Sequence, residues 1–194
     1  MANNVKNVVA GKPLAAGGVW RGPLGTALPT DETTALDAAL KAAGYIGEDG
    51  LTETQDRSVE KVKAWGGDTV KVVQTEFGLT YQFTFIESVN GEVLKAVHGT
   101  ANVTTTAATA SAGTKHAVKL TSDQLPHEVY VFEVKDGLAR IRIVVPDGQI
   151  TEVGEVTYAD GEVIGYQVTV EAFYDATLGA QAVKYIDDGQ KTAV

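Results

Sequence analysis

The sequence contains no cysteine, and this excludes disulfide bonds, a thiolate nucleophile and any metal site built on thiolate ligands. It has no apolar run near the roughly 20 residues of a membrane span, and residues 1–6 lack the apolar core of a secretory signal. The 16 basic and 25 acidic residues leave a net charge of −9, a poor basis for tight binding to nucleic-acid phosphates. We therefore expect an acidic, soluble protein that is made in a cytoplasm and does not insert into a membrane.

Motifs of catalysis and cofactor binding are also scarce. The nucleophile elbow, the phosphate-binding loop and the dinucleotide-binding fingerprint do not occur in the sequence. The three histidines, His98, His116 and His127, lack the short paired spacing of a zinc site. The adjacent carboxylates at 48–49 and 187–188 are more typical of turns than of an acid–base pair. We expect no catalytic residue, no metal site and no cofactor.

Charge is distributed unevenly along the chain. Residues 1–30 contain three basic residues and no acidic one, whereas residues 147–194 contain nine acidic residues and two basic ones. One interpretation is a chance distribution over a solvated surface. The other is that one end of the protein contacts the opposite end of an identical neighbour.

Two helices are predicted among segments that are otherwise extended or irregular. Residues 1–29 contain many glycines and prolines and are interpreted as an N-terminal arm, in which Val5, Val8 and Val9 could add a short edge strand. A helix is expected over 30–44, because Thr30 is a plausible N-cap and Gly44 a plausible C-terminal glycine. A shorter helix is expected over 90–98, followed by an exposed loop over 100–114 with strand-like ends.

The remaining patterns predict strands. Polar and apolar residues alternate over 79–85 and again over 164–175, and a last short strand is expected over 182–186. Turns are expected at Asp136-Gly137 and Asp160-Gly161. Folding about the first turn predicts three cross-strand pairs: Glu133 with Arg140, Phe132 with Ile141, and Tyr130 with Ile143. We expect one mainly β domain spanning 1–194, an antiparallel sandwich or barrel with a helix on its outside.

A long hairpin over residues 51–77 does not alternate cleanly between polar and apolar residues. With Gly66-Gly67 as the tip, Trp65 would face Asp68, Arg57 would face Glu76, and Val62 would face Lys71. Both faces then mix apolar and charged side chains. The hairpin is either a weakly patterned surface feature or a structure whose faces and edges contact other subunits. The second interpretation predicts a subunit interface that comprises Arg57, Val59, Lys61, Val62, Lys63, Trp65, Gly66, Gly67, Asp68, Val70 and Lys71.

A resemblance to a known family covers residues 44–97. It is carried by Gly44-Tyr-Ile-Gly-Glu-Asp-Gly50, by Asp56-Arg57 and by Ala64-Trp-Gly-Gly67 followed by Val70-Lys71. The following strand and the helical run Glu92-Val-Leu-Lys-Ala-Val97 fit the same pattern. These motifs resemble the major tail tube proteins of long-tailed, siphovirus-type bacteriophages, especially those that infect actinobacteria.

The resemblance implies a structural protein of the virion tail, assembled in the host cytoplasm. It implies hexameric rings that stack into a hollow tube, with an inner β-barrel built from several strands of each subunit. The implied partners are the tape-measure protein, the tail terminator and the distal tail proteins, and double-stranded DNA passes transiently through the tube. Polar strand faces that do not hold phosphate are then candidates for the lumen. They comprise Thr80, Gln82 and Thr84 in one strand, and Gln167, Thr169 and Glu171 in another.

Two further interpretations of the sequence remain open. A small β-barrel could bind an apolar ligand in a cavity lined by tyrosines and phenylalanines. Another phage morphogenetic protein, such as a tail terminator or a capsid decoration protein, could form rings or trimers that do not stack. The behaviour of the protein at rising concentration separates the first of these from a tube protein.

Overall fold

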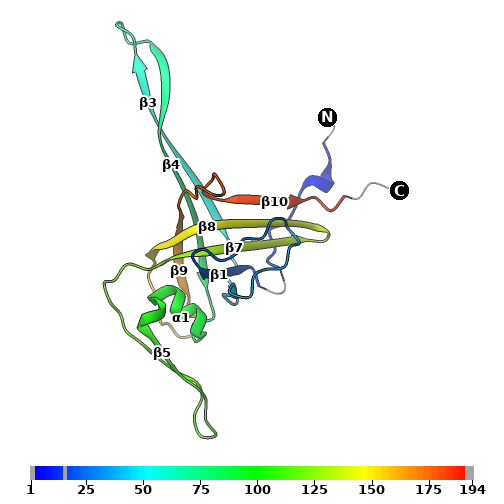
Figure 1. Ribbon diagram of the computed structural model, residues 1–194, viewed down its shortest axis with the longest axis vertical. Coiled ribbons are helices and arrows are strands. Elements are labelled where there is room, and N and C mark those ends of the chain that lie inside the picture. The colour runs from blue at the N-terminus through cyan, green and yellow to red at the C-terminus, as the bar shows by residue number, and fades with distance from the viewer. Residues whose placement is uncertain (1–2, 15–16, 191–194) are drawn as a thin grey trace.

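The computed structural model describes residues 3–14 and 17–190, and antiparallel strands dominate it (Figure 1). In chain order the elements are η1 (Val5–Asn7), β1 (Val19–Pro23), β2 (Lys41–Ala42), β3 (Thr52–Lys63), β4 (Thr69–Phe85), α1 (Gly91–His98), η2 (Thr100–Asn102), β5 (Val103–Thr106), β6 (Lys115–Val118), β7 (His127–Asp136), β8 (Ala139–Val153), β9 (Tyr166–Ala172) and β10 (Val183–Asp187). The predicted fold class is confirmed: the chain is mainly β and sandwich-like, although the described strands do not close into a barrel.

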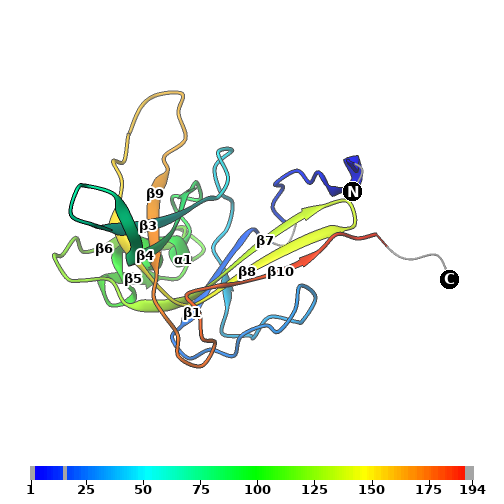
Figure 2. The same ribbon diagram turned by 90° about the horizontal axis from the view of Figure 1, so that it is seen from above.

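Eight strands form the main sheet, in the order β2-β1-β7-β8-β9-β4-β3, with β10 added beside β8. The long strand β8 organises this sheet because β7 occupies one of its edges while β10 and β9 share the other. Seen from above, β7, β8 and β10 run together toward the chain termini, and β9, β4 and β3 gather at the opposite end (Figure 2). Strands β5 and β6 form a separate two-stranded sheet.

The main hydrophobic core lies between α1 and the apolar faces of β4, β9 and β7. Helix α1 buries Val93, Leu94, Ala96 and Val97 in it. Tyr81 and Phe132 pack with their ring centroids 5.0 Å apart, and Phe83 and Phe85 with theirs 4.9 Å apart. A second apolar cluster on the other face of β7 and β8 comprises Leu40, Val129, Val131 and Val144. Strand β7 is therefore buried on both faces, as in a sandwich.

The short helix predicted over 90–98 is confirmed as α1. The side chain of Asn90 accepts a hydrogen bond from the backbone N–H of Glu92, and Gly99 ends the helix with a φ of +86°. The segment after it has the strand-like ends expected of 100–114, because β5 and β6 pair with each other. The last strand, expected over 182–186, is confirmed as β10.

The helix predicted over 30–44 is wrong: this segment contains bends and turns and ends in β2. The carboxylate of Asp31 accepts hydrogen bonds from the backbone N–H groups of Thr33 and Thr34, which fixes a turn where a helix would begin. Leu40 packs in the second apolar cluster. Gly44 does adopt the expected left-handed conformation, with a φ of +75°, but at the end of a strand.

Residues 1–29 are not all an arm, because β1 lies within them and pairs with β7 and β2. The edge strand expected near Val5 is instead the short 3₁₀ turn η1. Arg21 of β1 is buried and forms an ion pair with Glu128 at 2.6 Å. Residues 1–2 and 15–16 of the expected arm lie outside the described residues.

The register predicted for the β7–β8 hairpin is wrong by two residues. Glu133 pairs with Arg142 and Phe132 pairs with Ile143. The loop residues are Gly137 and Leu138, and only Gly137 has a positive φ, +59°, so the turn begins one residue later than expected. A shift of two residues keeps every side chain on its predicted face.

Candidate assembly surfaces

The six candidate lumen residues form one continuous surface. Strands β4 and β9 pair so that Thr80 faces Glu171, Gln82 faces Thr169, and Thr84 faces Gln167. The alternate residues of the same strands, including Tyr81, Phe83, Val168 and Val170, are buried in the core. The two polar patterns of the sequence therefore belong to one sheet face, which we call the polar face.

Two neighbouring strands extend this polar face with residues that the sequence analysis did not include. Thr52 and Thr54 of β3 lie opposite Gln82 and Thr80, and Glu152 of β8 lies opposite Thr169. Further along β3, Asp56 lies on the same face. Glu76 of β4, which pairs with Ser58, also lies on it. Residues 52–56 are all polar, so no alternation marks which of them share a face, and assigning them to the polar face required the strand pairing.

The β3–β4 hairpin extends far beyond the rest of the sheet (Figure 1). Its tip is wider than the expected two glycines: the N–H of Ala64 donates to the carbonyl of Asp68, and the N–H of Gly67 donates to that of Ala64. Trp65 therefore lies within the turn and does not pair with Asp68. Gly66 and Gly67 supply the positive φ angles, +112° and +98°, that the turn needs.

The predicted hairpin register is correct over residues 59–62 and wrong on both sides of them, since Lys63 nearer the tip pairs with Thr69 instead of Val70. Val62 faces Lys71 as expected, but Arg57 faces Phe77 instead of Glu76. The pairing is irregular at two points, where β4 contributes the extra residues Thr75 and Val70. The arginine lies over the ring of Phe77, 4.4 Å from its centroid, and its guanidinium donates to Gln74 at 3.1 Å.

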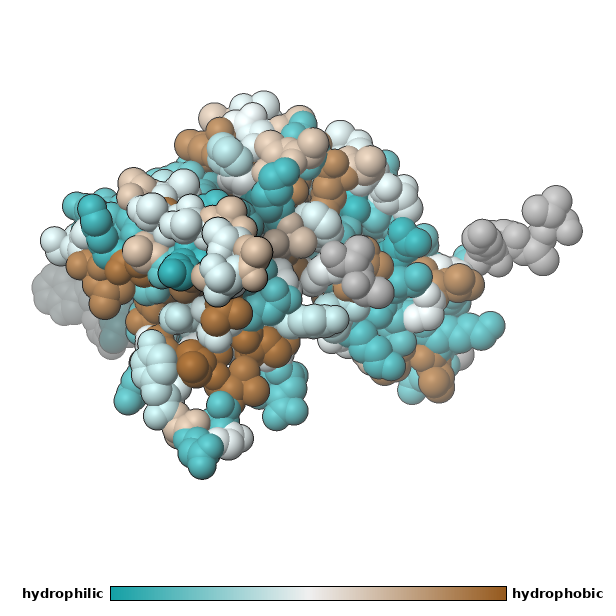
Figure 3. Space-filling model, turned by 90° about the horizontal axis from the view of Figure 1, so that it is seen from below, coloured by the Kyte–Doolittle hydropathy of each residue, from teal (hydrophilic) through white to brown (hydrophobic). Residues whose placement is uncertain are grey.

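All residues from 59 to 73 are exposed. The large apolar side chains among them are Val59, Val62, Trp65, Val70, Val72 and Val73. Trp65 is fully exposed, with a relative accessibility of 106%. Viewed from below, the opposite end of the molecule mixes hydrophobic and hydrophilic residues instead of presenting one uninterrupted apolar face (Figure 3). The hairpin therefore concentrates apolar surface that its own subunit leaves uncovered.

Charge divides the hairpin into two faces. Because the extra residues are in β4, β3 keeps a strict alternation of side chains. Arg57, Lys61 and Lys63 lie on the face that continues from the core, together with Val59. Asp56 and Glu60 lie on the face that continues from the polar face. We call the first of these the basic hairpin face.

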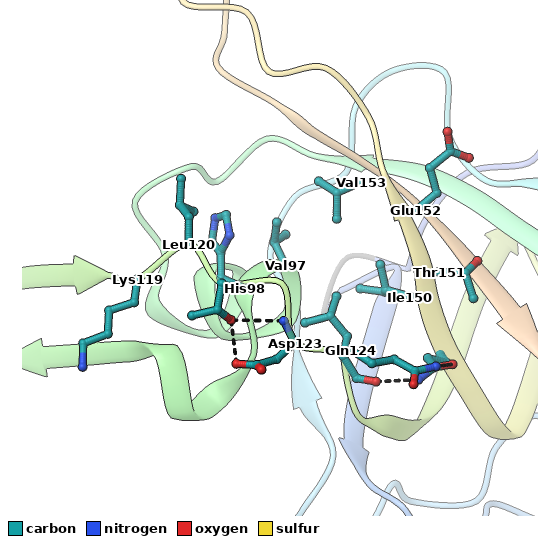
Figure 4. A pocket seen from close by; sticks show the side chains of 13 residues that line it. Val97, His98, Lys119, Leu120, Asp123, Gln124, Ile150, Thr151, Glu152 and Val153 are labelled. Carbon is teal, nitrogen blue, oxygen red and sulfur yellow. Dashed lines mark hydrogen bonds between the residues drawn. The ribbon is translucent and has the colours of Figure 1, made fainter.

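An open groove of about 560 Å³ lies between the end of α1, residues 119–125 and the last part of β8 (Figure 4). Its polar side chains bond to one another: the Gln124 side-chain amide donates to that of Gln149 at 3.2 Å, and Thr121 donates to Asp123 at 2.8 Å. Burial lowers the pKa of His98, which favours its neutral form. Within the described residues, no three His, Asp or Glu side chains are grouped as a metal site requires.

Comparison with protein families identifies the chain. The family described as phage tail tube protein matches residues 1–194. This chain belongs to the phage tail tube protein family. A phage tail tube protein is a structural protein of the virion tail, and its surfaces are therefore considered as assembly surfaces. In the part of the chain that the structure describes, no helix has the length and hydropathy needed to cross a membrane.

No curated protein matches this tail tube protein. Among solved structures it is similar to the anti-feeding prophage cap, described as a tube terminating cap, with 7% identity and a TM-score of 0.47. That match covers 96% of this chain and 100% of the cap chain.

The two chain ends with opposite charge lie near each other within this tail tube protein. The side chain of Gln190 donates to Asn7 at 2.9 Å, and Arg21 forms ion pairs with Glu128 and Glu92 of the same chain. Because Arg21 is already paired within the chain, Lys6 and Lys12 are the basic residues of segment 1–30 that are left for a neighbouring subunit. Contact between the ends of successive subunits stays a prediction.

Proposed function

We propose that this tail tube protein forms hexameric rings that stack into the hollow tube of a siphovirus-type tail, through which double-stranded DNA passes. The observation that carries the proposal is the division of one sheet into a buried apolar face and a continuous polar face, from which an uncovered hairpin projects. A tube subunit needs both: a wall that DNA can slide past and a surface that another subunit covers.

The polar face has the chemistry required of a lumen wall. Threonine and glutamine hold water, and the charged side chains at its centre and along β3, Glu171, Glu152 and Asp56, are acidic. Such a wall repels phosphate instead of retaining it. Lys61 and Lys63 lie on the other face of β3, so they do not add positive charge to this wall. Lys71 near the tip is the exception.

The hairpin has the properties of an interface between copies. A long exposed β-ribbon with apolar side chains aggregates unless its pairing is specified, and ring closure specifies it. Trp65 at the tip is the strongest candidate for an interface anchor, because buried tryptophans commonly dominate binding energy. Edge contacts of β3 with the sheet of a neighbour would then extend each sheet into the inner barrel of the tube.

The remaining partners follow from assembly as a phage tail. We propose that the rings polymerise in the host cytoplasm around the tape-measure protein, between the distal tail proteins and the tail terminator. No part of this role requires a catalytic residue or a cofactor. A ligand-binding barrel is less well supported, because the described strands do not close into a barrel and the buried aromatic rings pack against one another.

The test is removal of the hairpin. Deleting residues 58–72 joins Arg57 to Val73 and leaves residues 73–76 as a four-residue loop between the paired residues Arg57 and Phe77. We expect a folded monomer that forms no tubes. The substitution Trp65→Ala should weaken assembly by about 2 kcal/mol per contact, or roughly 30-fold.

Sedimentation and negative-stain microscopy measure assembly, and circular dichroism confirms folding. Leu138→Ala is the matched control, since Leu138 is an exposed apolar residue in a different turn, and it should leave tubes unchanged. Normal tubes from the deletion variant would contradict the role of the hairpin. Rings that never stack at any concentration would instead favour a terminator or decoration protein.

A further inference from the structure

The basic hairpin face is largely uncovered within its own subunit: Arg57 contacts Gln74 and Phe77 of the same hairpin, and the side chains nearer the tip are exposed. Arg57, Lys61 and Lys63 lie on it at alternate positions of β3, with Val59 between them and Val72 opposite Lys61. Among residues 3–14 and 17–190, the side chains of Lys61 and Lys63 form no hydrogen bond or ion pair, although their backbones pair with β4. No carboxylate of β3 beyond Glu53 shares this face. It is therefore a sheet face with positive charge and exposed valines, and it lies outside the core.

A second surface of the same protein has the complementary composition. The loop that joins β8 to β9 carries Glu155, Asp160 and Glu162. The sequence has no lysine or arginine between Arg142 and Lys184. Tyr158 and Val163 of this loop are 75% and 71% exposed. We call residues 154–163 the acidic loop.

The two surfaces cannot meet within one chain. The hairpin projects along the long axis of the molecule (Figure 1), whereas the acidic loop projects from the sheet in a perpendicular direction (Figure 2). The loop is held in this position from its base, since Val156 packs against the core and the N–H of Gly154 donates to the carbonyl of Gln167 at 2.8 Å. Each surface is thus presented to another molecule.

We propose that the basic hairpin face of one subunit docks on the acidic loop of a second copy. Lys61 and Lys63 then pair with carboxylates of the loop, while Val59 and Val72 cover Tyr158 and Val163. The contact joins two different patches, so each copy offers one and receives one, and such a contact closes into a ring when its rotation permits. This inference rests on the proposed function and names the surface that receives the hairpin.

Charge reversal tests the pairing. The hairpin variant Lys61→Glu/Lys63→Glu and the loop variant Glu155→Lys/Glu162→Lys should each reduce the sedimented tube mass about tenfold or more at physiological salt. The chain that carries all four substitutions should recover assembly, because the charges are again complementary. Lys115→Glu is the matched control, since Lys115 is an exposed lysine of β6 outside both surfaces, and it should leave assembly unchanged.

Engineered thiols test proximity without disturbing charge balance across a whole face. Since the chain has no cysteine, Lys63→Cys and Asp160→Cys introduce its only thiols. We expect oxidation of assembled tubes to link neighbouring subunits covalently, and Lys71→Cys with Asp160→Cys to give no such link. Linked subunits in the first pair alone would support the contact, and equal linking in both pairs would overturn the choice of face.

The outcomes separate this inference from the function on which it rests. A wild-type protein that forms no tubes would contradict the proposed function. Wild-type tubes together with normal assembly of the hairpin variant, or without recovery in the fourfold variant, would overturn the docking proposal and leave the tube function standing. All substituted residues are exposed, and circular dichroism verifies that each variant folds.

Discussion

The buried ion pair between Arg142 and Glu133 provides a demanding test of how the sandwich is held together. The two residues lie directly opposite each other on β8 and β7, and each is only 6% exposed. The guanidinium donates to Glu133 Oε1 at 2.9 Å through Nε, and to the carbonyls of Asp31 and Thr34 at 2.8 and 2.7 Å. One side chain therefore joins two strands to the segment that covers them.

Replacing Arg142 with methionine keeps most of the side-chain volume and removes every one of these donors. Breaking a buried pair from one side costs about 3–5 kcal/mol, because the remaining carboxylate stays buried without a counter-ion. Domains of this size are stable by about 5–15 kcal/mol in total. We therefore expect Arg142→Met to lose a large part of the free energy of unfolding while the second variant, Arg142→Met/Glu133→Leu, loses much less.

Urea unfolding of the monomeric protein, followed by circular dichroism, measures both changes. Lys95→Met is the control, because the pair of Lys95 with Glu92 is partly exposed and should contribute only about 0–1 kcal/mol. The reasoning is refuted if Arg142→Met costs less than about 1 kcal/mol, or if the double variant is as unstable as the single one.

Two further predictions concern the turn at Asp31 and the packing at Gly148. Hydrogen bonds from Thr34 and Thr33 lower the pKa of Asp31 below its ordinary value of 3.8. The stability that they contribute is therefore present above about pH 4 and is lost as the pH falls further. Between pH 5 and pH 3, Asp31→Ala should lose less stability than the wild type in urea titrations. A Cβ on Gly148 would lie 2.8 Å from Tyr130 and 3.0 Å from Val170, so Gly148→Ala should lower the free energy of unfolding by about 1–3 kcal/mol. A Cβ on Gly113 would have no atom within 4 Å, so the control Gly113→Ala should change the thermal midpoint little.

Local patterns predicted much of this fold. The capped helix α1, the alternating strand over 79–85, the hairpin with its glycine tip and the last strand all follow from residues close together in the sequence. The polar residues of β4 and β9 were also identified correctly as strand faces. Their union into one surface was not predictable, because it depends on pairing between segments about 90 residues apart.

The errors occur where distant contacts decide the local structure. Residues 30–44 have helical spacing, yet Arg142, more than 100 positions away, binds the carbonyls of Asp31 and Thr34 and holds the segment against the sheet. Glycine and proline around β1 suggested an arm, but β7 supplies the partner that makes Val19–Pro23 a strand. A sequence pattern gives no information on such partners, and propensity alone is therefore overridden.

The irregular pattern of the hairpin has a physical explanation in the strand that forms one of its arms. β4 is 17 residues long, and from Leu79 to Phe85 one of its faces is buried in the core. An extra residue there would turn aromatic side chains toward the polar face, so strict alternation is required. Nearer the tip no face is buried by the same chain, and the extra residues Thr75 and Val70 are accommodated. The part of β4 without regular alternation is therefore the part whose environment, under our proposal, a second copy completes.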